Sequence, residues 1–212
     1  AQFVRPDVHI EVRKKNAYVS RGAYKLEAAL QQFNISVEQK ICMDIGAATG
    51  GFTQVLLNHG ARRVYAIDTT RGKIAFALRH DPRVVVYEKT DIRRVCKESL
   101  TRCELLLNES MDIIVIDVSL IPLEYILEHI HDTMLSKPDG RIIALFKPQY
   151  QTRDSQHLRH GIIRSDTIRK ELLAQFEQWA TQHHWRVNAM MSSPIRGGKG
   201  NIEYLYLITH SH

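Results

Sequence analysis

The chain has 212 residues, 44% hydrophobic and 25% charged, so it can form one sizeable core but is short for two large domains. It has no apolar run near the roughly 18 residues that cross a bilayer and no secretion signal at its start, which argues against a membrane-spanning or secreted protein. The net charge of +6 suits a polyanionic partner such as RNA. We expect a soluble, cytoplasmic protein with no membrane partner.

Metal binding and disulfide bonding are both disfavoured by the cysteine and histidine patterns. The three cysteines have no CxxC spacing, and their odd number does not suggest a disulfide framework. The eleven histidines are scattered and include no HExxH pair. We therefore expect no bound metal and a reducing cellular setting. The sequence does not indicate an oligomeric state.

Strands and helices are predicted to alternate along the chain. Apolar residues with helical spacing over 23–33 precede short apolar runs, which we expect to form buried parallel strands. These runs are 41–45, 64–67, 84–87, 113–116 and 142–146. The segments between them predict helices near 51–59, 72–80, 92–99 and 122–135. This βαβ order is typical of a doubly wound sheet with helices on both faces.

The C-terminal part predicts a different connection. A long helix near 166–183 is followed by strands near 185–191 and 202–208, which are joined by a loop without a helix and should pair antiparallel. The segment 149–161 follows a strand end and is polar, basic and too poor in apolar residues to pack. We expect it to be a mobile loop that contacts the substrate.

A glycine-rich loop follows the first predicted strand, in the string Asp44-Ile45-Gly46-Ala47-Ala48-Thr49-Gly50-Gly51-Phe52. Glycines at the start of a helix allow a tight turn and a close approach of the backbone to a ligand. The chain has neither the GxGxxG dinucleotide pattern nor the Gly-Lys-Ser/Thr phosphate-binding pattern. A pyrophosphate or triphosphate ligand is therefore disfavoured.

Acidic residues end the first three predicted strands. Asp68 lies close to the roughly 20-residue offset from the glycine loop at which an acid reaches ribose hydroxyls. Asp91 is placed where it could accept a hydrogen bond from an adenine amino group. An aspartate at a strand end often only caps the next helix, but Asp44, Asp68 and Asp91 occur together beside glycines. Together they predict a nucleoside site at the carboxyl edge of the sheet.

Two further residues end the fourth and fifth predicted strands. Asp117 and Lys147 both occur where a doubly wound sheet places its chemistry. A lysine directly after an apolar strand is poorly placed for a solvated face, which makes Lys147 a candidate functional residue. Lys25 and Glu203 are unremarkable by themselves.

Several strings in the chain resemble the TlyA family, which belongs to the FtsJ-like methyltransferases and is also known under the name hemolysin. They are Tyr18-Val19-Ser20-Arg21-Gly22 with Lys25-Leu26, the glycine loop from Asp44 to Thr53, Ile116-Asp117-Val118-Ser119, Lys147-Pro148-Gln149, Ser193-Pro194-Ile195 and Gly200-Asn201-Ile202-Glu203. The resemblance runs from about Tyr18 to Leu207. It implies methylation of ribose 2′-hydroxyls in ribosomal RNA.

The resemblance also implies a fold, a cofactor and a set of site residues. The fold is a Rossmann-like α/β class I methyltransferase, with a seven-stranded, mostly parallel sheet and an antiparallel last strand. The cofactor is S-adenosylmethionine. The family's catalytic residues correspond to Lys25, Asp117, Lys147 and Glu203. Its cofactor contacts correspond to Gly46, Thr49, Gly50, Gly51, Phe52, Asp68, Asp91 and Asp117, to which we add Ala47 in the same loop.

The chemistry of ribose methylation suits these residue types. A ribose hydroxyl is a weak acid that must lose its proton as it attacks the methyl group, so a base or a cation that stabilises an alkoxide is required. We assign this role to Lys147. Repulsion from Lys25 and from the cofactor's sulfonium favours a neutral amine, while Asp117 and Glu203 orient the ammonium groups.

Family members usually carry an S4-type RNA-binding domain ahead of the methyltransferase. Here only about 17 residues precede the first matching string, so that domain was trimmed or is absent. We expect residues 1–17 to be an extension or a remnant linker and residues 18–212 to be the methyltransferase domain. A basic face for ribosomal RNA or ribosomal subunits is predicted at Arg13, Lys14, Lys15 and Arg21.

Three alternative functions remain open. Base methylation is disfavoured because no cysteine ends a predicted strand and because Asp-Val-Ser-Leu replaces the Asp/Asn-Pro-Pro-Tyr/Phe motif of amino methyltransferases. A catalytically idle RNA-binding protein of the same fold is disfavoured by the complete four-residue set. A membrane-active protein is disfavoured because the amphipathic segments fit helices that cover a sheet.

Overall fold

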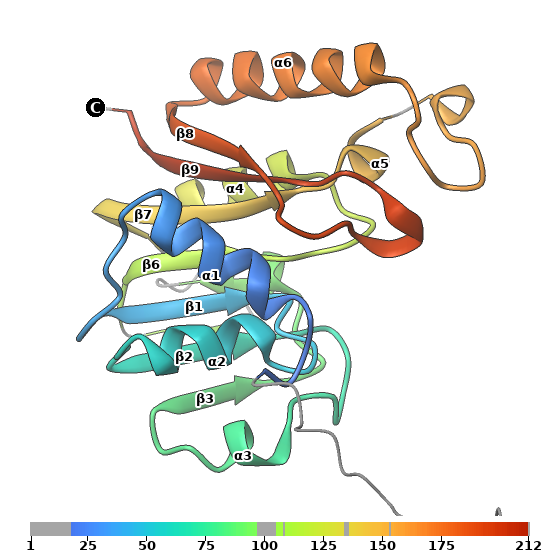
Figure 1. Cartoon of the computed structure of the whole chain (residues 1–212). Helices are drawn as coiled ribbons and strands as arrows, with labels where there is room; N and C mark the ends of the chain where they lie inside the picture. Colours follow the sequence, from blue (N-terminus) through green and yellow to red (C-terminus); the bar gives the residue numbers. More distant parts are fainter. Residues whose placement is uncertain (1–17, 97–104, 108, 134–135, 153, 212) are drawn as a thin grey trace, which may run out of the picture.

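The computed structural model describes residues 18–96, 105–107, 109–133, 136–152 and 154–211. Its main sheet has seven strands in the order β3-β2-β1-β6-β7-β9-β8 (Figure 1). β9 pairs antiparallel with both of its neighbours, whereas the other pairs are parallel, which confirms the predicted fold class. The strands are β1 (Ile41–Ile45), β2 (Arg63–Ile67), β3 (Val84–Tyr87), β6 (Met111–Ile116), β7 (Ser136–Phe146), β8 (Trp185–Ser192) and β9 (Tyr204–His210).

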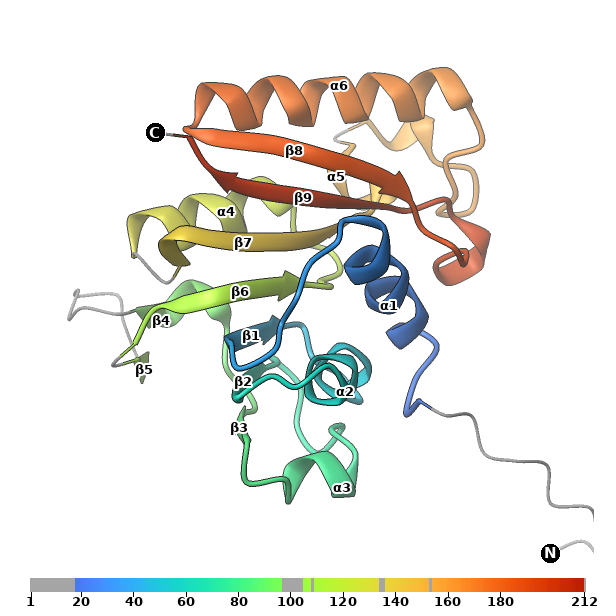
Figure 2. The same ribbon diagram turned by 60° about the vertical axis from the view of Figure 1, so that its left-hand side comes forward.

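Helices cover both faces of this sheet. α1 and α2 pack on one face, and α4 and α6 pack on the other (Figures 1 and 2). The helices are α1 (Ala23–Gln32), α2 (Gly51–Asn58), α3 (Phe76–Arg79), α4 (Leu123–Asp132), α5 (Pro148–Gln151) and α6 (Asp166–Gln182). Shorter 3-10 turns occur at Ile92–Arg94, Ser155–His157 and Gly198–Gly200.

The apolar strands are explained by this two-sided covering. In β6, Ile113 and Val115 point into the core under α1 and α2, whereas Ile114 and Ile116 point into the core under α4 and α6. Successive side chains of a strand alternate between faces, so a strand covered on both sides must be apolar throughout. Because the parallel strands all end at the same edge, the residues that follow them are brought together there.

Two of the predicted helices are much shorter than expected. The segment 72–80 forms one helical turn, Phe76–Arg79, after a turn in which Gly72 has a φ of +70°. Within the predicted helix 92–99, a 3-10 turn at Ile92–Arg94 leads into β4 (Val95–Cys96), which pairs with β5 (Leu105–Leu106). Val95 and Cys96 are fully buried, so pairing and burial outweigh the helical pattern there.

The segment 149–161 also departs from its prediction. It begins inside the helical turn α5, and the side chain of Gln149 is buried. Leu158 packs against the core. The expectation that this segment does not pack was therefore wrong at these two residues.

The cysteines differ from expectation as well. Cys42 is a buried free thiol, whereas Cys96 is disulfide-bonded. An odd number of cysteines prevents complete pairing but allows one bridge, and this is why the expectation of no disulfide failed. Among the described residues, no helix is both long enough and apolar enough to cross a membrane. The same part of the chain contains no cluster of three His, Cys, Asp or Glu side chains arranged to hold a metal ion.

Candidate active site

A cavity of about 390 Å³ lies at the carboxyl edge of the sheet, between the ends of β1, β2 and β6 and the turn after β3. Its size falls in the range of small-molecule sites. The lining combines apolar side chains with carboxylates. Apolar walls come from Ile45, Ile67, Ile92, Val118 and Ile121, and the carboxylates are Asp68, Asp91 and Asp117.

Gly46 forms the floor of this cavity, where the chain leaves β1. Its φ is +87°, and a Cβ atom at this position would lie 2.4 Å from the backbone oxygen of Asp117. Its backbone N–H donates to the carbonyl of Ile67 at 2.9 Å. Only glycine can combine this backbone conformation with such a close approach to β6. The first glycine of the predicted cofactor loop is therefore a requirement of the cavity's shape.

Asp68 holds the glycine loop and the following turn together. Its carboxylate accepts hydrogen bonds from the backbone N–H of Ala48 at 2.8 Å and from the backbone N–H of Thr70 at 2.7 Å. Burial alone would raise the pKa of Asp68, but the hydrogen bonds from Thr70 and Ala48 and the nearby Lys73 hold it below its usual value. Asp68 is thus a fixed carboxylate facing the cavity.

Asp91 also lines the cavity, but it has a clear structural role. It caps the 3-10 turn by accepting a hydrogen bond from the backbone N–H of Arg93 at 3.0 Å. It also forms an ion pair with the Arg93 side chain at 2.5 Å, and this arginine lowers the pKa of Asp91. Asp91 therefore lies where it was predicted, at the cavity. Its cap of the 3-10 turn already uses part of its capacity to accept hydrogen bonds.

The remaining predicted cofactor residues lie outside the cavity lining. Gly50 and Gly51 serve the packing of α2, since a Cβ would lie 2.3 Å from Leu78 at the first and 2.1 Å from Ser20 at the second. Phe52 belongs to the core under α1 and α2, and so does Ala47. Thr49 is exposed, and its carbonyl accepts a hydrogen bond from the backbone of Ala75.

The cavity fits a cationic nucleoside better than a phosphate. Three carboxylates line it, of which Asp91 and Asp117 are paired with Arg93 and Lys147 outside the lining, and Lys73 is the single cation among its described lining residues. Oδ1 of Asp68 already accepts from both the backbone N–H and the hydroxyl of Thr70, but Oδ2 accepts only from Ala48 among the described residues and can take a second hydrogen bond from a ribose hydroxyl. The apolar walls can hold a purine ring. The residues present therefore fit S-adenosylmethionine, whose sulfonium and amino group are positively charged.

Lys25 and Glu203 form a buried ion pair beside this edge. The Nζ of Lys25 lies 2.5 Å from Oε2 of Glu203, although the two residues are far apart in sequence. Lys25 is 7% exposed and Glu203 is 2% exposed. A buried pair of this kind is costly to break, because either charge left alone would be desolvated without compensation. α1 supplies the lysine, and the loop before β9 supplies the glutamate.

Lys147 and Asp117 form a second ion pair, which borders the cavity. The Nζ of Lys147 lies 2.6 Å from Oδ1 of Asp117 and donates to the Oγ of Ser119 at 3.1 Å. Phe146 of β7 is paired with Tyr204 of β9, so Lys147 and Glu203 are the next residues at the same end of the two strands.

The N-terminus of α1 is close to this second pair. A Cβ at Gly22 would lie 3.8 Å from Oδ2 of Asp117. Lys25 follows Gly22 by one helical turn, and its ion pair with Glu203 therefore forms near the Lys147–Asp117 pair. The structure brings all four predicted residues to one edge of the sheet, as two lysine–carboxylate pairs.

Two further side chains belong to this arrangement and were not singled out from the sequence. The Nε2 of Gln149 donates to Oε1 of Glu203 at 3.3 Å, and its own Oε1 is buried with no hydrogen-bond partner among the described residues. Ser119 accepts the hydrogen bond from Lys147. Both occur in strings that resemble the TlyA family, and this was the available signal.

Asp44, at the fourth position of β1, is a completely buried carboxyl beneath the glycine loop. Its Oδ2 accepts hydrogen bonds from the backbone N–H and the hydroxyl of Thr53, at 2.8 Å and 2.6 Å. Its Oδ1 has no hydrogen-bond partner among the described residues. Burial raises the pKa of Asp44 from 3.8 to about 7, with smaller contributions from Asp117 and Asp68, against the Thr53 hydrogen bonds that lower it.

Asp44→Asn is therefore expected to remove a pH dependence of stability. The folded protein keeps the Asp44 proton up to about pH 7, whereas the unfolded chain loses it near pH 4. The contribution of Asp44 to the free energy of unfolding should be greatest below about pH 4 and decrease up to about pH 7, by about 4 kcal/mol. Asparagine keeps an acceptor for Thr53 and stays neutral. Urea unfolding of both proteins at several pH values should show the wild type losing stability relative to the variant between about pH 4 and pH 7, and parallel profiles would contradict the assignment.

The predicted RNA-binding residues are only partly described. Arg13, Lys14 and Lys15 lie outside the described residues, as does the predicted extension 1–17. Arg21 is exposed at the start of α1, one residue before Gly22.

Comparison with known proteins gives consistent matches over most of the chain. The family model described as FtsJ-like methyltransferase matches residues 18–209. Hemolysin A of Brachyspira hyodysenteriae is 38% identical over 205 residues, which cover 97% of this chain and 82% of that protein. The 16S/23S rRNA (cytidine-2′-O)-methyltransferase TlyA of Mycobacterium tuberculosis is 36% identical over 198 residues, which cover 93% and 70% of the two chains.

A solved structure shows the same fold. The structure of a hemolysin-type protein from Streptococcus thermophilus superposes with a TM-score of 0.84 at 37% sequence identity. The superposition covers 93% of this chain and 69% of that one.

Proposed function

Because the chain belongs to the FtsJ-like methyltransferase family, we propose that it transfers a methyl group from S-adenosylmethionine to a ribose 2′-hydroxyl of ribosomal RNA. The observation that carries the proposal is the Lys147–Asp117 ion pair, which borders a cavity suited to the cofactor. Related proteins named as rRNA cytidine-2′-O-methyltransferases support the RNA substrate. Residues 18–212 would form the methyltransferase domain, and the ribosomal substrate implies a cytoplasmic location.

The cofactor would be held at the ends of the parallel strands. Asp68 would accept hydrogen bonds from its ribose hydroxyls, and Asp91 would contribute negative charge next to the apolar wall around the adenine. Gly46 allows the backbone after β1 to pass close to Asp117 at the edge of this cavity. When bound, S-adenosylmethionine supplies an electrophilic methyl group on a positively charged sulfur.

The chain's own residues would handle the proton of the ribose. As the 2′-oxygen forms its bond to the methyl carbon, its proton must leave, and the Nζ of Lys147 would accept it after giving up its own proton. Asp117, at 2.6 Å, stabilises the ammonium that forms, and Ser119 orients the amine. Lys25, held in place by Glu203, adds positive charge that stabilises the oxygen as negative charge develops.

The same residues disfavour base methylation. Methylation at C5 of a pyrimidine needs a cysteine nucleophile, and Cys42 is buried within β1. Methylation of an exocyclic amino group commonly uses a proline-rich motif after the fourth strand, where this chain has Asp117-Val118-Ser119-Leu120. A lysine beside a carboxylate instead suits an oxygen nucleophile with a removable proton.

The proposal is tested by identifying the methylated product. Purified protein is incubated with methyl-labelled S-adenosylmethionine and either unmodified transcribed 16S and 23S rRNA or ribosomal subunits, and the RNA is digested to nucleosides. We expect the label in a 2′-O-methylated nucleoside. RNA methylated beforehand with unlabelled cofactor is the control and should accept little label. Label in a base would contradict the proposal, and RNA binding without any transfer would favour the idle RNA-binding protein.

A further inference from the structure

A second cavity, of about 530 Å³, is lined in part by Lys25. One wall is the start of α1, with Arg21, Gly22 and Lys25, and the other is the glycine-rich loop 195–200. Arg196 and Lys199 on this loop also line the cavity. We call it the basic cavity. Neither Arg196 nor Lys199 is among the residues expected from the sequence to bind RNA.

The charge of the basic cavity is strongly one-sided. None of its described lining residues is acidic, and Lys25 is already neutralised by the buried Glu203. Arg21, Arg196 and Lys199 are exposed and form no ion pair among the described residues. Arg196 donates a hydrogen bond to the carbonyl of Gly200 at 3.1 Å, which positions its guanidinium without cancelling the charge. These three cations therefore suit an anionic ligand.

The loop that carries two of these cations is held firmly in place. Asn201 is 4% exposed, and its side chain donates to the carbonyls of Gly161 at 2.9 Å and Gly198 at 3.2 Å. Its Oδ1 accepts a hydrogen bond from the backbone of Ile163 at 3.2 Å. The loop is thus joined to the neighbouring segment 159–164 before any ligand binds. Preorganised cations lose less conformational entropy when they bind an anion.

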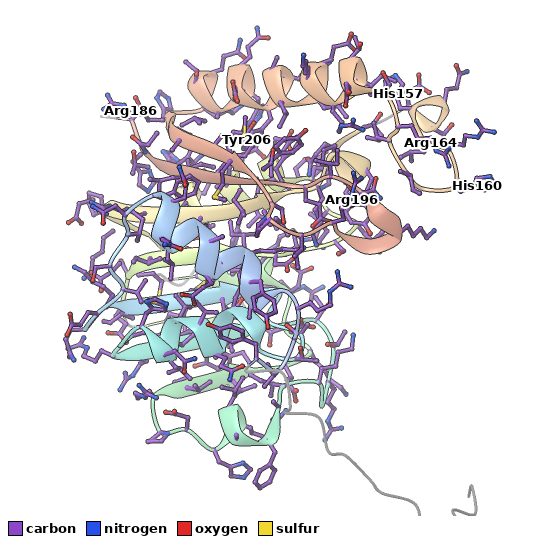
Figure 3. All side chains as sticks on the ribbon, in the orientation of Figure 1. His157, His160, Arg164, Arg186, Arg196 and Tyr206 are labelled. Carbon is purple, nitrogen blue, oxygen red and sulfur yellow. The ribbon has the colours of Figure 1, made fainter. Side chains whose placement is uncertain are left out.

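The positive charge continues onto that neighbouring segment. Arg159, His160 and Arg164 are exposed there, and His160 and Arg164 lie on the same side of the molecule as Arg196 (Figure 3). Arg186, by contrast, lies at the opposite end (Figure 3). The basic cavity therefore opens onto a longer basic surface, as expected for a chain of phosphates rather than for a single small anion.

We propose that the basic cavity binds a backbone phosphate of the RNA substrate next to the ribose that is methylated. This inference rests on the proposed function. Every ribose within an RNA strand is flanked by phosphodiesters, so cations beside the reacting hydroxyl are well placed to hold the backbone there. The basic cavity shares Lys25 with the candidate catalytic set and is bounded by Gly22, which lies against Asp117.

The test uses Arg196→Gln, Lys199→Gln and the double variant, with Arg186→Gln as the matched control on an exposed arginine of β8. Binding to a fluorescent transcribed rRNA fragment is measured by anisotropy at several salt concentrations, without cofactor. We expect the double variant to bind RNA about 10- to 100-fold more weakly and its salt slope to decrease by about 1, because the two cations hold one phosphate. In methyl transfer, KM for RNA should rise while kcat changes less than about threefold.

The outcomes separate this inference from the proposed function. If the double variant binds RNA with the affinity and salt slope of Arg186→Gln, the basic cavity is not a phosphate site. A lower kcat with unchanged RNA binding would overturn the inference as well. If the wild-type protein transfers no methyl group to ribose, the proposed function fails, but the binding measurement still decides whether RNA occupies the cavity. Melting temperatures, and calorimetry with S-adenosylmethionine, should match the wild type in all four variants.

Discussion

Replacing Lys147 by alanine is expected to lower the rate of methyl transfer by about 10²- to 10⁴-fold, with S-adenosylmethionine still bound. Lys147 is the residue that would take the proton from the ribose hydroxyl, and it is held for this by Asp117 and Ser119. It does not line the cofactor cavity, so its removal should leave cofactor affinity nearly unchanged. Single-turnover kinetics would measure the rate of methyl transfer, and isothermal titration calorimetry would measure the affinity for S-adenosylmethionine.

Lys147→Arg distinguishes a base from a fixed cation. Arginine keeps the positive charge and can pair with Asp117, but it does not give up its proton in proteins. If Lys147 acts as the base, the arginine variant should be as slow as the alanine variant. Substantial activity in the arginine variant would instead assign Lys147 to charge stabilisation alone.

The matched control for Lys147 is Lys170→Ala, since Lys170 is an exposed lysine on α6. It should have wild-type activity. Near-normal turnover of Lys147→Ala, with cofactor bound and the fold intact, would remove Lys147 from the catalytic set. The role of accepting the ribose proton would then have to be assigned to Lys25 instead.

Gly197→Ala is expected to reduce methyl transfer by about 100-fold, although Gly197 itself carries no reactive group. Its backbone has a φ of −72° and a ψ of −168°, which alanine adopts without strain. The added methyl group, however, would lie 1.9 Å from Oε1 of Glu203 and 2.2 Å from its Cδ. Because Glu203 is buried and bound to Lys25 and Gln149, it can move only by breaking those contacts.

Gly198→Ala is the adjacent control, since a Cβ there meets no atom within 4 Å. Its rate of methyl transfer at saturating RNA should match that of the wild type, because the Glu203 carboxylate is not displaced. A double-mutant cycle with Glu203→Ala then separates positioning from a general loss of stability. If Gly197 acts only through the Glu203 carboxylate, adding Gly197→Ala to Glu203→Ala should cause little further loss of activity. Additive losses, or equal activity of the two glycine variants, would contradict this role.

The order of strands and helices could be largely predicted because it depends on local patterns. Five continuous apolar runs became β1, β2, β3, β6 and β7, since strands covered on both faces must be apolar throughout. The long periodic segment near 166–183 became α6 with nearly the expected ends. The prediction failed near 92–99, where burial of Val95 and Cys96 in a short parallel pair decided the conformation. That burial depends on partners that are distant in sequence.

The candidate site was likewise predictable only in part. Its residue types could be identified from the sequence, because Asp68, Asp91, Asp117 and Lys147 follow predicted strands and the ends of parallel strands share one edge. Five loop residues assigned to the cofactor, Ala47, Thr49, Gly50, Gly51 and Phe52, lie outside the cavity lining. Their motif is recognisable, but only the packing of α2 shows that Gly50 and Gly51 make room for Leu78 and Ser20.

The fold class and the charged residues of the site were therefore predictable, since both follow from local hydrophobic pattern and short motifs. Which charges meet depends instead on how distant segments pack. Lys25 pairs with Glu203 because β9 inserts between β7 and β8, and this sheet order is set by long-range packing that no short segment encodes. The same packing places Arg21 opposite Arg196 and Lys199, and so creates a basic cavity from cations that had seemed unrelated.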